Sequence, residues 1–209
     1  FPPRPHSLQR GDHRVHDAAP CREHQRRLTA FVALARVGSR GGSGTRRGWA
    51  LELDLRPEFD DAVWRQVEER GGAACVVMIS VHNYEEVIET YDTSIAGELI
   101  VNISERIQRL VRPLDVVAYF SPGLFALVLI QPNIKQCTAE CYKRIFDGVR
   151  LKSYTTSAGF QPVSIGMSIC AATADTGAPT VGNMIKFATR ELDESVRTES
   201  IMVHHLIPE

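Results

Sequence analysis

The sequence predicts one α+β domain in which helices pack on a largely antiparallel sheet. A continuous apolar run at Cys75–Val81 contains several β-branched residues, which is typical of a strand buried on both faces. Two further apolar segments flank residues 121–123, a Ser-Pro-Gly sequence with the chemistry of a tight turn, and together they predict a β-hairpin. Segments with helical periodicity separate these strands, which favours helices layered on a sheet.

The first 50 residues differ in charge from the rest of the chain. They hold ten Arg and three acidic residues, a charge of +7, whereas the 209-residue chain has a formal net charge of −1. We expect residues 1–50 to be a basic, largely disordered tail and linker, with a short helix compatible with 21–37, and residues 51–209 to be the domain. A solvated tail, or the remnant of an upstream domain in a fragment that begins at Phe1, is favoured over a nucleic-acid-binding segment, because no aromatic residues alternate with the arginines.

Three helices and one strand are predicted before the hairpin. Apolar residues recur every three or four positions in the first and third helices, which gives each one buried face. A glycine pair follows the first helix and Pro113 follows the third, and both are typical of helix ends. The predicted helices are 56–70, 84–91 and 96–111, and the strand is 75–81.

Four elements are predicted after the hairpin strands at 116–120 and 124–130. A helix at 133–149 is expected to turn Ile134, Cys137, Cys141 and Ile145 towards the core. The remaining predicted elements are a strand at 162–171, a helix at 179–195 and a closing strand at 200–206.

The five cysteines indicate a reducing, cytosolic compartment. Their odd number and scattered spacing argue against a disulfide framework. Cys137 and Cys141 are four residues apart, which predicts one helix face, and helix packing is favoured there over a metal site. No apolar run approaches the roughly 18 residues that a membrane span needs.

The hairpin, the helix before it and the Ser-Ile-Gly strand together resemble the GGDEF family, the diguanylate cyclases of bacterial signalling. The likeness runs from about Leu53 to Leu206. It implies a nucleotide-cyclase palm-like, mixed and largely antiparallel sheet flanked by helices, in a bacterial cytoplasmic protein. The matching residues are Leu53, Arg56, Phe59, Ser164, Ile165, Gly166, Ala188 and Leu192.

The family's catalytic positions hold different residues in this chain. Members of the family condense two GTP molecules into cyclic di-GMP, and they use carboxylates to hold divalent metal on the triphosphate. Here the run 75–81 contains no carboxylate, and the signature hairpin keeps only its Phe. We therefore expect no catalysis, no metal and no cofactor. The degenerate active-site positions are Ser80, His82, Ile88, Gly97, Ser121, Pro122, Gly123 and Leu124, and the family's phosphate-holding Lys falls near Val196.

One motif of the family is retained. Its members carry an inhibitory Arg-x-x-Asp site that ends five residues before the hairpin signature, and this chain has Arg112 and Asp115 in that register. The family's second arginine, from the next helix, corresponds to Arg144. The resemblance implies that these three residues bind cyclic di-GMP, since a guanidinium suits guanine or phosphate and a carboxylate accepts from guanine. The alternative is that Arg112 and Asp115 only stabilise a helix end and its loop.

Three functions follow from these observations. The favoured one is a non-catalytic cyclic di-GMP receptor that relays binding to a partner protein or a homodimer interface. The alternative is an inert GGDEF-like dimerisation or protein-interaction module without a ligand. Residual diguanylate cyclase activity is the third, and the missing carboxylates argue against it.

Overall fold

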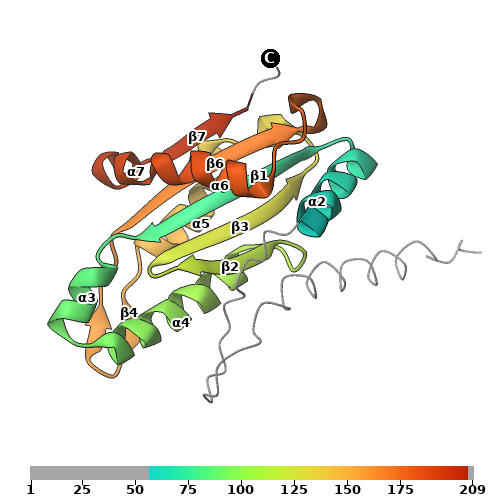
Figure 1. Ribbon diagram of the computed structural model, residues 1–209. Coiled ribbons are helices and arrows are strands. Elements are labelled where there is room, and N and C mark those ends of the chain that lie inside the picture. The colour runs from blue at the N-terminus through green and yellow to red at the C-terminus, as the bar shows by residue number, and fades with distance from the viewer. Residues whose placement is uncertain (1–56, 207–209) are drawn as a thin grey trace, which may run out of the picture.

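A five-stranded sheet with helices on both faces forms the centre of the molecule (Figure 1). The computed structural model describes residues 57–206, so the basic tail, the helix predicted at 21–37, and Leu53 and Arg56 lie outside the described residues. The strand order is β2-β3-β1-β6-β7, and β6–β7 is the parallel pair in an otherwise antiparallel sheet. The predicted α+β class is confirmed.

The elements follow the predicted order along the chain. The sheet strands are β1 (Ala73–Val81), β2 (Val116–Ser121), β3 (Leu124–Gln131), β6 (Ile165–Thr173) and β7 (Ile201–His205). The helices are α2 (Pro57–Arg70), α3 (Tyr84–Thr90), α4 (Thr93–Leu110), α5 (Ala139–Arg150), α6 (Val181–Arg190) and α7 (Leu192–Thr198). Short 3-10 turns lie at Ile134–Gln136 and Ala174–Thr176, and a small separate hairpin is formed by β4 (Tyr154–Thr156) and β5 (Gly159–Gln161).

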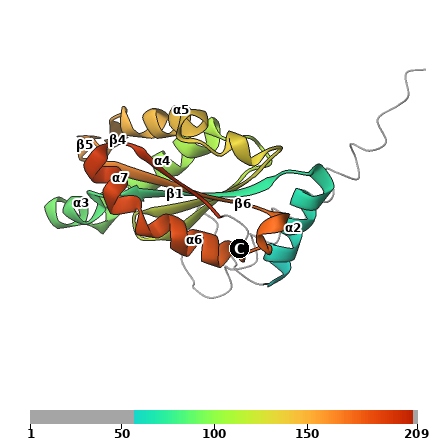
Figure 2. The same cartoon turned by 90° about the horizontal axis from the view of Figure 1, so that it is seen from above.

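Two hydrophobic cores lie on opposite faces of the sheet, and β1 contributes to both. Its residues Cys75, Val77 and Ile79 pack with α4 and α5, whereas the alternate residues between them pack with α2 and α6. Figure 2 shows these two helical layers on either side of the sheet. The alternation of side chains along a strand explains why every residue of this run is apolar or small, since both faces of β1 are buried from Ala73 to Ile79.

The hairpin at residues 121–123 is confirmed. β2 and β3 pair antiparallel across it, and Gly123 has a φ of +70°, a conformation that glycine adopts without steric cost. A Cβ at this position would lie 2.9 Å from the Cβ of Tyr84. The turn therefore needs glycine for its backbone and for its close contact with α3.

The helix predicted at 133–149 is divided. Asn133 closes a 3-10 turn by accepting a hydrogen bond from the Lys135 N–H, and Cys137 has non-helical angles of φ −89° and ψ 61°. The α-helix starts only at Ala139, so Cys137 and Cys141 do not share a helix face. Cys137 is buried as predicted, but the prediction that Cys141 faces the core is wrong, because its side chain is exposed.

The helix predicted at 179–195 is also divided. α6 ends where the Glu191 N–H bonds to the carbonyl oxygens of Ala188 and Thr189, and α7 begins at Leu192 in a new direction. The β4–β5 hairpin was not predicted, since strands of three residues show no periodicity. It is attached to α4 through the Asn102 side chain, which donates to the Thr155 carbonyl oxygen at 2.7 Å.

Two glycines test how tightly the sheet and its helices are packed. An added Cβ at Gly166 would lie 2.6 Å from the Leu192 carbonyl oxygen, whereas nothing lies within 4 Å of the same atom at Gly97. We expect Gly166→Ala to lower the free energy of unfolding by about 1–3 kcal/mol through overpacking. Gly97→Ala, inside α4, should raise it by about 0.5–1 kcal/mol. Urea unfolding of both variants checks this, and equal effects would contradict the described packing.

Candidate functional site

The positions that the sequence predicts to be a degenerate active site lie on β1, on the β2–β3 hairpin, in the turn after β1, on α3 and on α4. Ser80 is the cross-strand partner of Leu124, and the Val81 N–H donates to the Gly123 carbonyl oxygen at 2.7 Å. His82 follows in the turn after β1, Ile88 lies on α3 and Gly97 lies on α4. Strand β1 and the hairpin thus bring Ser80 and Leu124 together.

These residues do not fit a divalent metal on a triphosphate. The Ser80 hydroxyl is buried without a hydrogen-bond partner among the described residues, and Leu124 has no polar side-chain atom. His82 is exposed, and Ile88 packs against the hydrophobic core. Hard cations need oxygen ligands, and these positions supply no carboxylate. Nowhere in residues 57–206 do three or more His, Cys, Asp or Glu side chains form a group that could hold a metal.

Side chains that sequence reasoning did not single out hold this edge of the sheet together. The Asn83 amide donates to the Pro162 carbonyl oxygen at 3.1 Å and accepts from the Ser164 N–H at 2.9 Å, which fixes the start of α3 against the approach to β6. The Tyr119 hydroxyl accepts from the Gly123 N–H at 3.1 Å. Burial raises the pKa of Tyr119 to about 12, so the hydroxyl remains protonated at neutral pH.

The predicted Arg112 and Asp115 form a closed loop after α4. The Asp115 carboxylate accepts from the Arg112 backbone N–H at 2.8 Å and from its Nε at 3.3 Å, and Arg112 Nη2 lies 3.2 Å from the other carboxylate oxygen. The same Nη2 donates to the Ile130 carbonyl oxygen at 3.2 Å. The Asp115 side chain is 5% exposed and that of Arg112 is 52% exposed. The pair therefore joins the loop to the end of β3.

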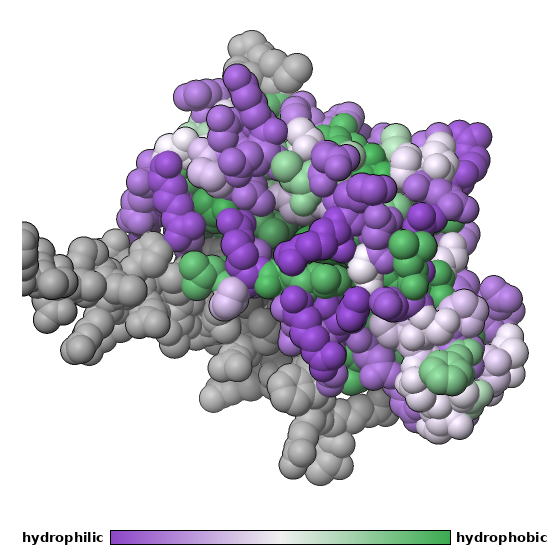
Figure 3. Space-filling view, turned by 180° about the vertical axis from the view of Figure 1, so that it is seen from behind, coloured by the Kyte–Doolittle hydropathy of each residue, from purple (hydrophilic) through white to green (hydrophobic). Residues whose placement is uncertain are grey.

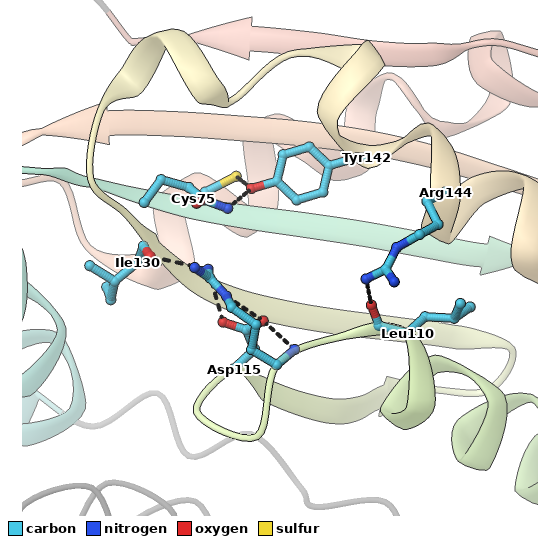
Figure 4. A network of polar contacts seen from close by, with 8 residues as sticks. Cys75, Leu110, Asp115, Ile130, Tyr142 and Arg144 are labelled. Atoms are coloured by element: carbon cyan, nitrogen blue, oxygen red, sulfur yellow. Dashed lines mark hydrogen bonds and ion pairs between the residues drawn. The ribbon is translucent and has the colours of Figure 1, made fainter.

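Arg144 approaches the same region from α5. Its Nη2 donates to the Leu110 carbonyl oxygen at 2.6 Å, in the last turn of α4, where the backbone carbonyls lack helical partners (Figure 4). No acidic side chain within residues 57–206 forms an ion pair with Arg144. Its charge is therefore not neutralised by the described residues, whereas that of Arg112 is balanced by Asp115.

A pocket of about 240 Å³ brings the three predicted residues together. Arg112 and Asp115 line it from the loop and Arg144 lines it from α5. Gln131, Cys141 and Tyr142 also line it, and sequence reasoning assigned them no role in a site. Figure 3 looks onto the face covered by α4 and α5, where hydrophilic side chains predominate with apolar ones between them. A small pocket with cationic side chains suits an anionic ligand.

A chain of hydrogen bonds leads from two residues that line this pocket into the core. The Tyr142 hydroxyl accepts from Gln131 Nε2 at 2.7 Å and donates to Cys75 Sγ at 3.1 Å. Figure 4 shows the bond from Tyr142 on α5 to Cys75 on β1. Burial raises the pKa of the Tyr142 hydroxyl and of the Cys75 thiol, so both groups stay protonated. No sequence signal could have found this chain of hydrogen bonds, because Cys75 and Tyr142 are 67 residues apart.

Comparison with known proteins assigns the chain to a family. The family model described as "Diguanylate cyclase, GGDEF domain" matches residues 55–200. This chain belongs to the GGDEF family. No curated protein sequence matches it significantly. As for membranes, no helix among the described residues of this GGDEF domain is long and apolar enough to cross one.

Solved GGDEF structures share the fold at low identity. The GGDEF domain of YfiN (TpbB) from Pseudomonas aeruginosa is 17% identical, with a TM-score of 0.60, over 75% of this chain and 94% of that one. The GGDEF domain of DgcB from Caulobacter crescentus, in complex with c-di-GMP, is 17% identical with a TM-score of 0.60, over 80% and 98%. SiaD from P. aeruginosa, in complex with its activator SiaC, is 14% identical with a TM-score of 0.60, over 90% and 68%. At these identities the likeness establishes the fold.

Asp115 and Arg144, the acidic residue and one of the basic residues of the pocket, should contribute differently to the free energy of unfolding. Asp115→Ala leaves three donor contacts of Arg112 without their buried acceptor, and we expect it to lower the free energy of unfolding by roughly 1–3 kcal/mol. Arg144→Ala removes one bond from an exposed side chain and should cost less than about 1 kcal/mol. Chemical denaturation checks this order, and the reverse order would show that the loop does not depend on Asp115.

Proposed function

We propose that this GGDEF domain is a cytoplasmic bacterial receptor that binds cyclic di-GMP and does not synthesise it. The observation that carries the proposal is the convergence of Arg112, Asp115 and Arg144 on one pocket, although they come from a loop and a separate helix. Membership of a family that includes a domain solved with c-di-GMP supports the choice of ligand. The residues at the degenerate catalytic positions support the absence of synthesis.

The chemistry of the pocket suits a cyclic dinucleotide. Arg144 has no acidic partner among the described residues, and a phosphodiester supplies the missing anion through charge-assisted hydrogen bonds. Arg112 keeps half of its side chain exposed although it is paired, so its guanidinium still presents donors and a flat face to a base. The volume of about 240 Å³ is below the roughly 300–1,000 Å³ of a pocket that encloses a whole drug-sized ligand, so it admits part of the dinucleotide.

Ligand occupancy would be read by another protein or by a second copy of the domain. Binding at the pocket ties the loop after α4 to α5, because Arg112 and Arg144 lie on these two segments. The partner-bound state of SiaD supports a role in which a GGDEF domain acts through protein contacts.

Removing Arg144 should separate binding from folding. We expect wild-type protein to bind cyclic di-GMP at concentrations up to tens of micromolar, and Arg144→Ala to weaken binding by about tenfold to a hundredfold through loss of a charged donor. Lys143→Ala is the control, since Lys143 is the neighbouring residue on α5 and pairs with Asp147 at 3.4 Å. Isothermal titration calorimetry measures all three proteins. Absence of wild-type binding in this range would refute the receptor function.

Incubation with GTP and Mg²⁺ tests the loss of synthesis. We expect no cyclic di-GMP above the rate without protein, since Ser80 and Leu124 offer no carboxylate to a metal. Chromatographic detection of the product, with an active diguanylate cyclase as the positive control, checks this. Product formation would restore the cyclase hypothesis.

A second candidate is a ligand-free interaction module. The observation in its favour is that the Asp115 carboxylate is nearly buried and fully engaged by Arg112, which gives the pair a structural role without any ligand. Under this hypothesis the wild type does not bind cyclic di-GMP. Arg112→Ala then changes the free energy of unfolding and has no effect on ligand binding. The calorimetric comparison therefore separates the two candidates.

A further inference from the structure

Three side chains outside the predicted Arg-x-x-Asp motif form a chain of hydrogen bonds that begins at the pocket wall and ends in the core. Gln131 ends β3, Tyr142 lies on α5 and Cys75 lies on β1. They are joined in series by hydrogen bonds of 2.7 Å and 3.1 Å, and the central residue, Tyr142, is only 2% exposed. Gln131 and Tyr142 line the pocket, and Cys75, which bonds to Tyr142, belongs to the hydrophobic core.

The buried hydroxyl of Tyr142 fixes the orientation of the Gln131 amide. A hydroxyl removed from water needs its hydrogen-bond partners, and here it donates to Cys75 Sγ and accepts from Gln131 Nε2. The amino group of Gln131 is therefore turned towards Tyr142, and the carbonyl oxygen, Oε1, is turned away from it. No described residue donates a hydrogen bond to Oε1.

Among the side chains that line the pocket, Gln131 is the hydrogen-bond acceptor whose orientation is fixed by a neighbouring residue, Tyr142. Arg112 and Arg144 can only donate, and the carboxylate of Asp115 is nearly buried against Arg112. Gln136 also lines the pocket, but it is exposed and its side chain has no hydrogen-bond partner among the described residues. The pocket lining therefore combines one acceptor of fixed orientation, Gln131, with two cationic donors, Arg112 and Arg144.

We propose that Gln131 reads the base of the bound cyclic dinucleotide and selects guanine over adenine, with Tyr142 as its positioning residue; this inference rests on the proposed receptor function. Guanine offers two adjacent donors, N1–H and N2–H, to a carbonyl oxygen, whereas adenine offers the N6–H donor beside N1, an acceptor that the carbonyl oxygen repels. Glutamine pairs with adenine when its amide can donate and accept together. In this pocket the amino group is already engaged by Tyr142.

Two substitutions test the inference through selectivity, defined as the ratio of the dissociation constants for cyclic di-AMP and cyclic di-GMP. Gln131→Leu removes the acceptor and should weaken cyclic di-GMP binding by about fivefold without weakening cyclic di-AMP binding. Tyr142→Phe keeps the ring but frees the amide to turn, and it should lower the selectivity by a similar factor. Calorimetry with both dinucleotides measures the ratio for each protein.

Tyr154→Phe is the matched control. Its hydroxyl is also buried, donates to the Val149 carbonyl oxygen at 3.0 Å and does not line the pocket, so its loss should reduce stability and leave selectivity unchanged. Unchanged selectivity in both Gln131→Leu and Tyr142→Phe, with wild-type binding intact, would overturn the base-reading role and leave the receptor function standing. Failure of wild type to bind either dinucleotide would instead overturn the receptor function itself.

Discussion

The burial of β1 on both faces is the constraint on which the rest of the structure depends. The strand pairs with β3 on one side and β6 on the other, and its side chains alternate between two separate cores. Because a shift of one residue would exchange the two sets of side chains, the register is strongly specified. That register places Ser80 opposite Leu124 at one end and Ala73 opposite Gln131 at the other. One strand pair thus positions both the edge that contains Ser80 and Leu124 and the pocket that Gln131 lines.

Tyr142 shows how a polar group can remain inside such a core when it is paired. Tyr142 reaches the core side of β1 with both a donor and an acceptor satisfied, and this pairing connects the buried Cys75 to the pocket surface. In the loop after α4, the nearly buried carboxylate of Asp115 is paired by an ion pair and by hydrogen bonds, since it accepts from the side chain and backbone of Arg112. An arginine has five donors, so its structural pairing leaves donors for a ligand. A structural role and a binding role for Arg112 are therefore compatible.

The two ends of the β1–β3 pair have different chemistry. At the hairpin end, Ser80, His82 and Leu124 present a hydroxyl, an imidazole and an aliphatic group, and Tyr119 holds the turn through the Gly123 N–H. At the other end, cationic side chains from two elements meet around a cavity. Catalysis on GTP requires metal neutralisation of a triphosphate, whereas binding of a phosphodiester requires only donors. This difference is the basis of the proposed receptor function.

The sequence by itself determined the elements with strong local patterns and the register of the motifs. Apolar continuity predicted β1, the Ser-Pro-Gly turn predicted the β2–β3 hairpin, and spacing within the family's pattern identified Arg112, Asp115 and Arg144, which the fold gathers around one pocket. Only the tertiary structure decided where Asn133 and Glu191 interrupt predicted helices, that Cys141 is exposed, and that Gln131 is held by Tyr142. The physical reason is that periodicity reports which side of an element meets the core, whereas hydrogen-bond partners distant in sequence are chosen by how the packed elements meet in space.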